Sequence, residues 1–168
     1  MKNKSLLITI AVSAALLAGC KNGVNGDMLA SSGMSAYKAA TLSDTDVKTL
    51  SSNACKQMDS QNQLAGKSSK YTRRLGKIAK ALGNNIDGTP VDYKVYITSD
   101  VNAWAMANGC VRVYSGLMDL MTDNEIEGVL GHELGHVSLG HSRKAMQTAY
   151  ATLAARDAIS ATSGVASQ

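Results

Sequence analysis

The segment at residues 132–136 constrains this 168-residue chain more than any other. It has the pattern H-E-x-x-H, formed by His132, Glu133 and His136. Each residue of an α-helix turns about 100° around the axis, so side chains four positions apart lie about 40° from each other. On a helix the two imidazoles therefore project from one face and can bind one metal ion. Glu133 lies beside them, where it can take a proton from a water molecule, so the pattern predicts a zinc site with Glu133 as the general base.

The residues around this pattern predict that it lies on a helix. Thr122 and Glu125 have the spacing of a capping box, in which a hydroxyl and a carboxylate close the start of a helix. Apolar residues then recur at helical spacing, at Ile126, Val129, Leu130 and Val137. Gly128, Gly131 and Gly135 also lie on this stretch. Because glycine costs about 1 kcal/mol in a helix interior, we expect another backbone segment to pack closely against these glycines.

A signal peptide is predicted at the N-terminus. Lys2 and Lys4 form a short basic segment, and residues 6–17 are apolar except for Thr9 and Ser13. At about 12 residues, this apolar segment is shorter than the roughly 20 residues that a membrane-spanning helix requires. Without the signal peptide the formal net charge falls from +4 to +2, because two lysines and no acidic residues are removed. The charge therefore gives no reason to expect a nucleic-acid partner.

The end of the signal, Leu17-Ala18-Gly19-Cys20, resembles the lipobox of bacterial lipoproteins. This resemblance implies a signal peptide at residues 1–19 and acyl chains such as palmitate on Cys20, which would anchor the chain to a membrane. Lys21 stands where lipoproteins kept in the inner membrane have aspartate, so we expect an outer-membrane anchor facing the periplasm. The alternative is an ordinary signal peptide with a nearby cysteine. Residues 20–40 contain much glycine, serine and asparagine and are expected to form a flexible tether.

Cys55 and Cys110 are the other two cysteines of the chain. In an oxidising periplasm, two thiols in one small domain are expected to form a disulfide. The alternative is a pair of buried free thiols. Zinc binding by these cysteines is disfavoured, because neither has a partner at C-x-x-C spacing.

Two helices and a small sheet are predicted before the motif helix. The expected elements are a helix capped at Ser43, a second helix at 69–82, and strands at 91–98, 103–106 and 110–114. Gly88-Thr89-Pro90 is expected to be a turn, and Asn108-Gly109 a hairpin turn. This order predicts an α+β domain over residues 41–168.

The strand formed by Ala103, Trp104, Ala105 and Met106 precedes the motif helix. If it lies at an exposed edge of the sheet, an extended peptide can pair with it and place the scissile bond near the metal. The alternative is that this strand serves only as scaffold.

Together these features resemble the M48 metallopeptidases. The runs Asn102–Gly109 and Val111–Met118 are similar to the sheet before the catalytic helix of that family, and Asp123–His136 is similar to the helix itself. The resemblance implies a zincin fold of the gluzincin type and one catalytic zinc ion. It also implies endopeptidase activity on unfolded or misassembled proteins of the bacterial envelope. The implied partners are these substrates, the membrane, and other envelope proteases or assembly factors.

The chain departs from the family at the third zinc ligand. A catalytic zinc site of this kind has three protein ligands, and the family's third is a glutamate on a later helix. No glutamate follows Glu133 here. His141 would point away from His132 if the helix continued, and Asp157 does not match the family pattern, so neither is expected to replace it. We therefore expect a fold that is incomplete at the C-terminus. Two alternatives to an active peptidase stay open: an inactive lipoprotein that only binds envelope proteins, and a purely structural metal site.

Overall fold

The computed structural model describes residues 25–163. The expected signal peptide and Cys20 lie outside this range. The described residues belong to two units: Leu42–Gln147 form one, and residues 25–41 with 148–163 form the other. The helices are α2 (Gly26–Thr41), α3 (Asp44–Gln61), α4 (Lys70–Leu82), α5 (Ser115–Leu120), α6 (Asp123–Ser138) and α7 (His141–Ser163). The strands are β1 (Asn85–Ile86), β2 (Thr89–Pro90), β3 (Asp92–Tyr96), β4 (Ala103–Ala105) and β5 (Cys110–Tyr114).

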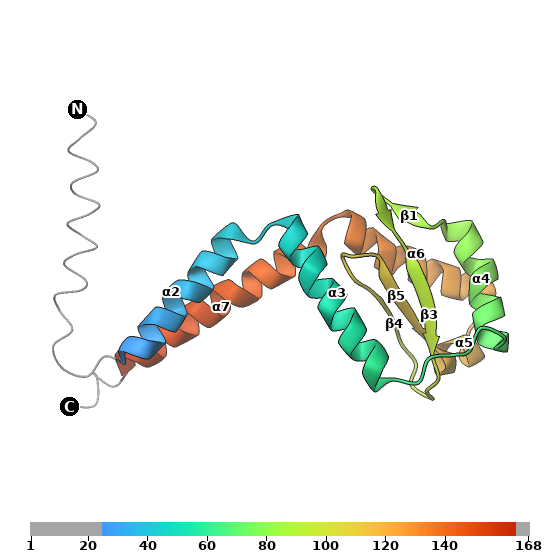
Figure 1. Cartoon of the computed structure of the whole chain (residues 1–168), viewed down its shortest axis with the longest axis horizontal. Coiled ribbons are helices and arrows are strands. Elements are labelled where there is room, and N and C mark those ends of the chain that lie inside the picture. Colours follow the sequence, from blue (N-terminus) through green and yellow to red (C-terminus); the bar gives the residue numbers. More distant parts are fainter. Residues whose placement is uncertain (1–24, 164–168) are drawn as a thin grey trace. The chain divides into compact units, whose positions relative to one another are not determined.

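The larger unit contains a three-stranded sheet in the order β3-β5-β4. The central strand β5 runs parallel to β3 and antiparallel to β4. Helix α3 contacts β5, whereas α4 contacts β3 and α6 contacts β4. Figure 1 shows α3 and α4 on opposite sides of the strands. The mixed helix-and-sheet composition agrees with the predicted α+β class.

The hairpin between β4 and β5 turns one residue earlier than the sequence suggested. The N–H of Gly109 donates to the carbonyl oxygen of Met106 at 2.9 Å, so Ala107 and Asn108 occupy the centre of the turn. Gly109 follows with φ of +81°, in the left-handed region. A Cβ atom at Gly109 would also collide with the carbonyl oxygen of Pro90. Glycine is therefore required here both for its backbone angle and for close packing.

The predicted turn at Gly88-Thr89-Pro90 is also shifted. Asp87 and Gly88 both have positive φ, at 47° and 80°, and they connect β1 to β2. This is the backbone pattern of a two-residue hairpin turn with positive φ at both central positions. Thr89 and Pro90 therefore belong to the strand that follows the turn.

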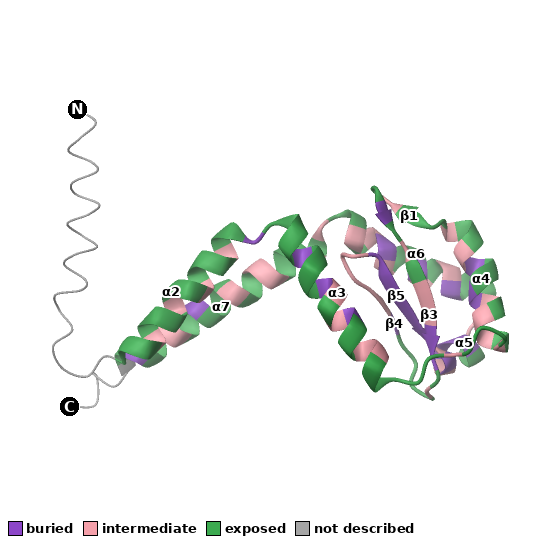
Figure 2. Cartoon of the chain, viewed as in Figure 1, coloured by how far each residue is buried: buried purple, intermediate pink, exposed green. Residues whose placement is uncertain are grey.

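One face of the sheet packs on α4 and α6 to form the apolar core. Figure 2 shows how completely the central strand is buried. The core residues are Leu75, Ile78, Val95, Ala103, Val111, Val113, Leu117, Met118, Ile126, Leu130 and Leu134. Complete burial of a Leu, Ile or Val side chain contributes about 1.5–3 kcal/mol. This packing fixes α6, which carries the H-E-x-x-H segment, against the sheet.

The start of α6 is fixed by polar contacts as well as by packing. The predicted capping box is present, because Thr122 and Glu125 each accept from the other's backbone N–H. From α4, the guanidinium of Arg74 donates to the backbone carbonyls of Met118 and Met121, at the end of α5. Arg74 therefore links α4 to the residues that directly precede α6.

The expected close approach to the α6 glycines is wrong for the described residues. A Cβ atom on Gly128 or Gly135 would meet nothing within 4 Å, and one on Gly131 would meet only Leu82, at 3.9 Å. The buried face of α6 carries Ile126, Leu130 and Leu134, and the three glycines lie away from that face. The space above Gly128 and Gly135 is therefore open.

Residues 20–40 were expected to form a flexible tether, but their described part is helical from Gly26 onward, in α2. Helix α2 packs against the C-terminal part of α7, where Ala154 and Ala161 are buried. Ser32 Oγ donates to the carbonyl oxygen of Ala154 at 2.9 Å, and Ser31 Oγ donates to Asp157 at 3.0 Å. These contacts come from residues more than a hundred positions away and stabilise a helix that composition alone does not favour. Within residues 25–163, no helix is both long enough and apolar enough to cross a membrane.

Candidate metal centre

The two histidines of the motif converge on the exposed side of α6. The Nε2 atoms of His132 and His136 lie 3.0 Å apart, and the two rings meet edge to face with centroids 4.5 Å apart. Both side chains are exposed. The helical spacing therefore brings together the two nitrogen atoms that a metal would need, and their role as ligands stays a prediction.

Zinc fits this pair of nitrogen atoms. Zinc–nitrogen bonds of about 2.05 Å in tetrahedral geometry hold two ligating nitrogens roughly 3.3 Å apart. The observed separation of 3.0 Å is close to this value, so small side-chain rotations would suffice. Among the described residues, no group of three or more His, Cys, Asp or Glu side chains is placed to hold a metal ion. Residues 25–163 thus provide two ligands and not the third.

Glu133 lies between the histidine face and the apolar face of α6. Helical geometry places it about 100° from His132 and about 60° from His136. Its side chain is half-buried, whereas both histidines are exposed. A carboxylate in this position would lie close to an ion held by both histidines without ligating it, which is the place that a general base requires.

The predicted substrate strand is an edge strand of the sheet, since β4 pairs with β5 on one side. Tyr114 N–H donates to Asn102 O at 3.0 Å, and Met106 N–H donates to Cys110 O at 2.9 Å. By the alternation of an antiparallel pair, the backbone groups of Ala105 point away from β5. The edge strand therefore has an outward-facing donor and acceptor that an extended peptide can pair with.

The indole of Trp104, on this strand, is a buried polar group without a partner. Its Nε1 is inaccessible to solvent and has no hydrogen-bond acceptor within the described part of the chain. The ring packs at a tilt against Tyr96, with centroids 6.1 Å apart.

His141 does not point away from the motif, contrary to the expectation for a continuous helix. Helix α6 ends at Ser138, and Gly140 takes φ of +66° before α7 begins. This break returns His141 to the histidine pair, where its Nδ1 lies 2.6 Å from Nδ1 of His136. In the sequence, Gly140 was the residue that could have indicated this break between the two helices.

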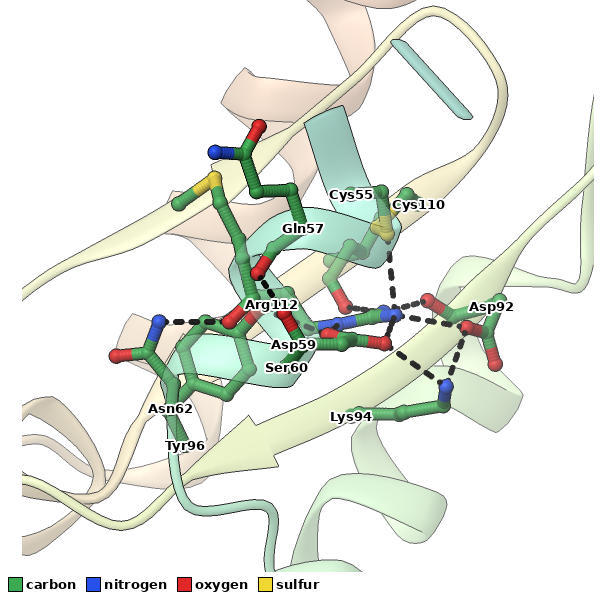
Figure 3. Close-up of polar contacts among 12 residues, drawn as sticks. Cys55, Gln57, Asp59, Ser60, Asn62, Asp92, Lys94, Tyr96, Cys110 and Arg112 are labelled. Atoms are coloured by element: carbon green, nitrogen blue, oxygen red, sulfur yellow. Dashed lines mark hydrogen bonds and ion pairs between the residues drawn. A yellow bond between two sulfur atoms is a disulfide. The ribbon is translucent and has the colours of Figure 1, made fainter. Parts of the chain in front are cut away.

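The other face of the sheet contains a buried charged cluster that sequence reasoning missed (Figure 3). Arg112 is 1% exposed, and its Nε and Nη2 donate to the two carboxylate oxygens of Asp59, each at 2.8 Å. Nη2 also donates to Asp92 at 3.0 Å. Tyr96 donates to Asp59 at 2.7 Å, and Lys94 donates to Asp59 at 3.2 Å. The cluster attaches α3 to β3 and β5.

The predicted disulfide is confirmed and explains this cluster. Cys55 on α3 and Cys110 on β5 are bonded, with Cα atoms 6.5 Å apart. Asp59 lies four residues beyond Cys55, about 6 Å along the helix, and Arg112 lies two residues beyond Cys110, about 6.6 Å along the strand. Both steps keep the same face, and because α3 and β5 run in the same direction from the disulfide, Asp59 and Arg112 meet.

The cluster changes the titration of its members. Hydrogen bonds from Arg112 hold the pKa of the Asp59 carboxyl well below its usual range. Burial, together with the hydrogen bond to Asp59, raises the pKa of the Tyr96 hydroxyl well above its usual range. At neutral pH the cluster therefore contains an ionised Asp59 and a neutral Tyr96.

Comparison with known proteins identifies the family. Residues 68–168 match peptidase family M48. The chain is 72% identical over 170 residues to the metalloprotease YcaL of Escherichia coli (strain K12), covering 100% of this chain and 67% of YcaL. The chain belongs to peptidase family M48. Membership in family M48 implies a zincin-like fold and a metal ion, typically zinc.

Other M48 relatives match to different extents. The metalloprotease LoiP of Escherichia coli (strain K12) is 56% identical over 165 residues, which cover 98% of this chain and 65% of LoiP. The protease HtpX of Haemophilus ducreyi (strain 35000HP / ATCC 700724) is 41% identical over 58 residues, which cover 32% of this chain and 20% of HtpX. This M48 chain spans about two thirds of the length of YcaL and LoiP.

Proposed function

We propose that this M48 chain is a zinc-dependent endopeptidase of the gluzincin type. The observation that carries the proposal is the convergence of the His132 and His136 Nε2 atoms, 3.0 Å apart, on the helix that also presents Glu133. A structural zinc site has no need of a carboxylate beside its ligands, whereas hydrolysis requires a base there.

In this proposal each residue of the motif has a distinct task. His132 and His136, in their neutral form, hold the ion through Nε2. The chemistry that a bound zinc supplies is Lewis acidity toward the scissile carbonyl and a lowered pKa for the attacking water. Glu133 accepts the proton of that water and later delivers it to the nitrogen of the leaving amine.

Strand β4 is proposed to hold the substrate. It lies at the sheet edge and contacts α6, so a peptide paired with its outward backbone groups would run close to the histidines. Backbone pairing recognises an extended chain regardless of most side chains, which suits unfolded or misassembled proteins of the bacterial envelope. We propose these as the substrates, with other envelope proteases or assembly factors as partners.

We propose the periplasmic face of the outer membrane as the location. The Leu17-Ala18-Gly19-Cys20 sequence and the following Lys21 support this proposal. The test is labelling with radioactive palmitate and membrane fractionation of the wild-type chain and Cys20→Ala. The proposal is supported if both the incorporation of palmitate and the recovery of the chain in the outer-membrane fraction require Cys20. Equal labelling and fractionation of the two chains would contradict it.

The test of activity is cleavage of casein by the full chain in detergent with added Zn²⁺. We expect cleavage that is abolished by a chelator and by Glu133→Ala. Cleavage that continues in either control would contradict the proposed mechanism.

The second candidate is an inactive lipoprotein that only binds envelope proteins. It is favoured by the absence, among residues 25–163, of a third side chain placed to complete the metal site. A folded wild-type chain that binds casein without cleaving it would favour this candidate.

A further inference from the structure

His136 lies between two other imidazoles and contacts them through different ring nitrogens. Its Nε2 faces Nε2 of His132 at 3.0 Å, and its Nδ1 faces Nδ1 of His141 at 2.6 Å. The rings of His136 and His141 are tilted by 52°, with centroids 4.9 Å apart. The two contacts use the two different nitrogens of the His136 ring. Nε2 faces the other proposed ligand, and Nδ1 faces His141.

Between two neutral imidazoles, a hydrogen bond at the His136–His141 contact can run in one of two directions. A neutral imidazole has one N–H donor and one acceptor nitrogen. If His136 donates from Nδ1, its Nε2 has a free lone pair that faces His132. If His141 donates instead, the proton of neutral His136 lies on Nε2, where it blocks metal binding. Only the first arrangement leaves Nε2 of His136, the nitrogen that faces His132, able to bind zinc.

The backbone places His141 for this contact. Gly140, with φ of +66°, separates α6 from α7, so that His141 is the first residue of the new helix. His141 does not join the two Nε2 atoms: it approaches His136 from the Nδ1 side. It is therefore placed as a support for a ligand and not as the missing ligand.

We propose that His141 is a positioning residue, which accepts a hydrogen bond from Nδ1–H of His136 and thereby fixes the tautomer and ring orientation that bind zinc. This inference rests on the proposed function, because it assigns His136 as a zinc ligand. Partners of this kind typically change metal affinity by 10–100-fold when they are removed.

The test is the affinity of the full chain for Zn²⁺, measured in detergent by competition with a chromophoric chelator. His141→Phe keeps a ring of similar shape but has no acceptor, and we expect it to bind Zn²⁺ about 10–100-fold more weakly. His141→Gln has an acceptor oxygen and is expected to restore most of the affinity. Because His141 is exposed, neither change should alter the circular dichroism spectrum or the melting temperature of the metal-free chain.

A separate variant distinguishes failure of this inference from failure of the metal site. His132→Ala removes a proposed ligand and should weaken Zn²⁺ binding more than His141→Phe does. If binding depends on His132 but is the same in wild type and His141→Phe, the positioning role is overturned and the metal site stands. If His141→Gln is as weak as His141→Phe, hydrogen bonding is not the cause, which also overturns the inference. If the wild-type chain binds no Zn²⁺, both the metal site and the role of His141 are overturned.

Discussion

The guanidinium of Arg112 lies 2.8 Å from each carboxylate oxygen of Asp59, in a side-on pair beneath α3. The same guanidinium is 3.2 Å from Sγ of Cys55, so the ion pair and the disulfide adjoin each other. Together they hold α3 against β5, whose opposite face packs in the same apolar core as α6, the helix of the candidate metal site. The contribution of the ion pair and that of the disulfide to stability can be tested separately.

Replacing Asp59 with asparagine is expected to destabilise the protein by about 3 kcal/mol, because it leaves a buried guanidinium without its main counter-charge. Urea unfolding at neutral pH measures the change. Asp44→Asn is the matched control, since Asp44 pairs with Arg143 at 3.1 Å on an exposed surface. Exposed pairs contribute little, so the control should unfold almost as the wild type does. Equal stability of Asp59→Asn and wild type would contradict the expected role of the pair.

The same pair predicts how stability depends on pH. The pKa of Asp59 is lower in the folded chain than its unfolded value of about 3.9, so folding favours the ionised form. The contribution of Asp59 is therefore complete above about pH 5 and is lost as pH falls through and below 4. Urea midpoints measured from pH 6 to pH 3 should fall more steeply for wild type than for Asp59→Asn. Parallel curves would show that Asp59 is not the responsible carboxylate.

Removing the disulfide by the double change Cys55→Ala and Cys110→Ala should also destabilise the chain. The bond joins residues 55 positions apart, and closing a loop of that length is worth about 4 kcal/mol in the chain-entropy model. The urea midpoint of the double variant should not change on addition of dithiothreitol, whereas that of wild type should fall toward it. A wild-type midpoint that is unaffected by reduction would refute the stabilising role.

The sequence predicted best where structure is determined by near neighbours. The starts of α3 and α6 follow from the caps at Ser43 and Thr122, each of which pairs with a carboxylate three residues later. Such capping interactions form within one turn of helix and do not depend on the rest of the fold. The convergence of the motif histidines follows in the same way from the helical repeat alone.

Prediction failed where the partner is far along the chain. Helix α2 is stabilised by residues such as Ala154, which composition around α2 cannot reveal. Arg112 alternates with Val111 and Val113, a pattern that places a charged residue on the solvent side, yet α3 covers that side. The contact of His141 depends on how Gly140 turns the chain, a backbone angle that the helical period does not specify.

The edge strand can be tested at Ala105, whose backbone N–H points away from β5. Ala105→Pro removes this donor without removing a bond of the sheet, so a paired substrate loses one backbone hydrogen bond and meets the proline ring. We expect kcat/KM for an unfolded substrate to fall about tenfold while the melting temperature changes little. Ala105→Ser retains the N–H and should cleave as wild type does. If the proline and serine variants cleave equally well, the strand is scaffold and does not bind substrate.

Glu133→Gln separates zinc binding from catalysis. The glutamine has the size of the glutamate but cannot accept the proton, so cleavage should fall about 10²–10⁴-fold. Because Glu133 is not expected to ligate the ion, Zn²⁺ should still stabilise this variant, by about 2.7 kcal/mol at a hundredfold excess over Kd. His132→Ala should lose that stabilisation, which differential scanning fluorimetry with and without Zn²⁺ would detect. Glu133→Gln that binds Zn²⁺ and cleaves at the wild-type rate would mean that Glu133 is not the base. Loss of Zn²⁺ stabilisation in Glu133→Gln would instead show that the carboxylate takes part in binding the ion.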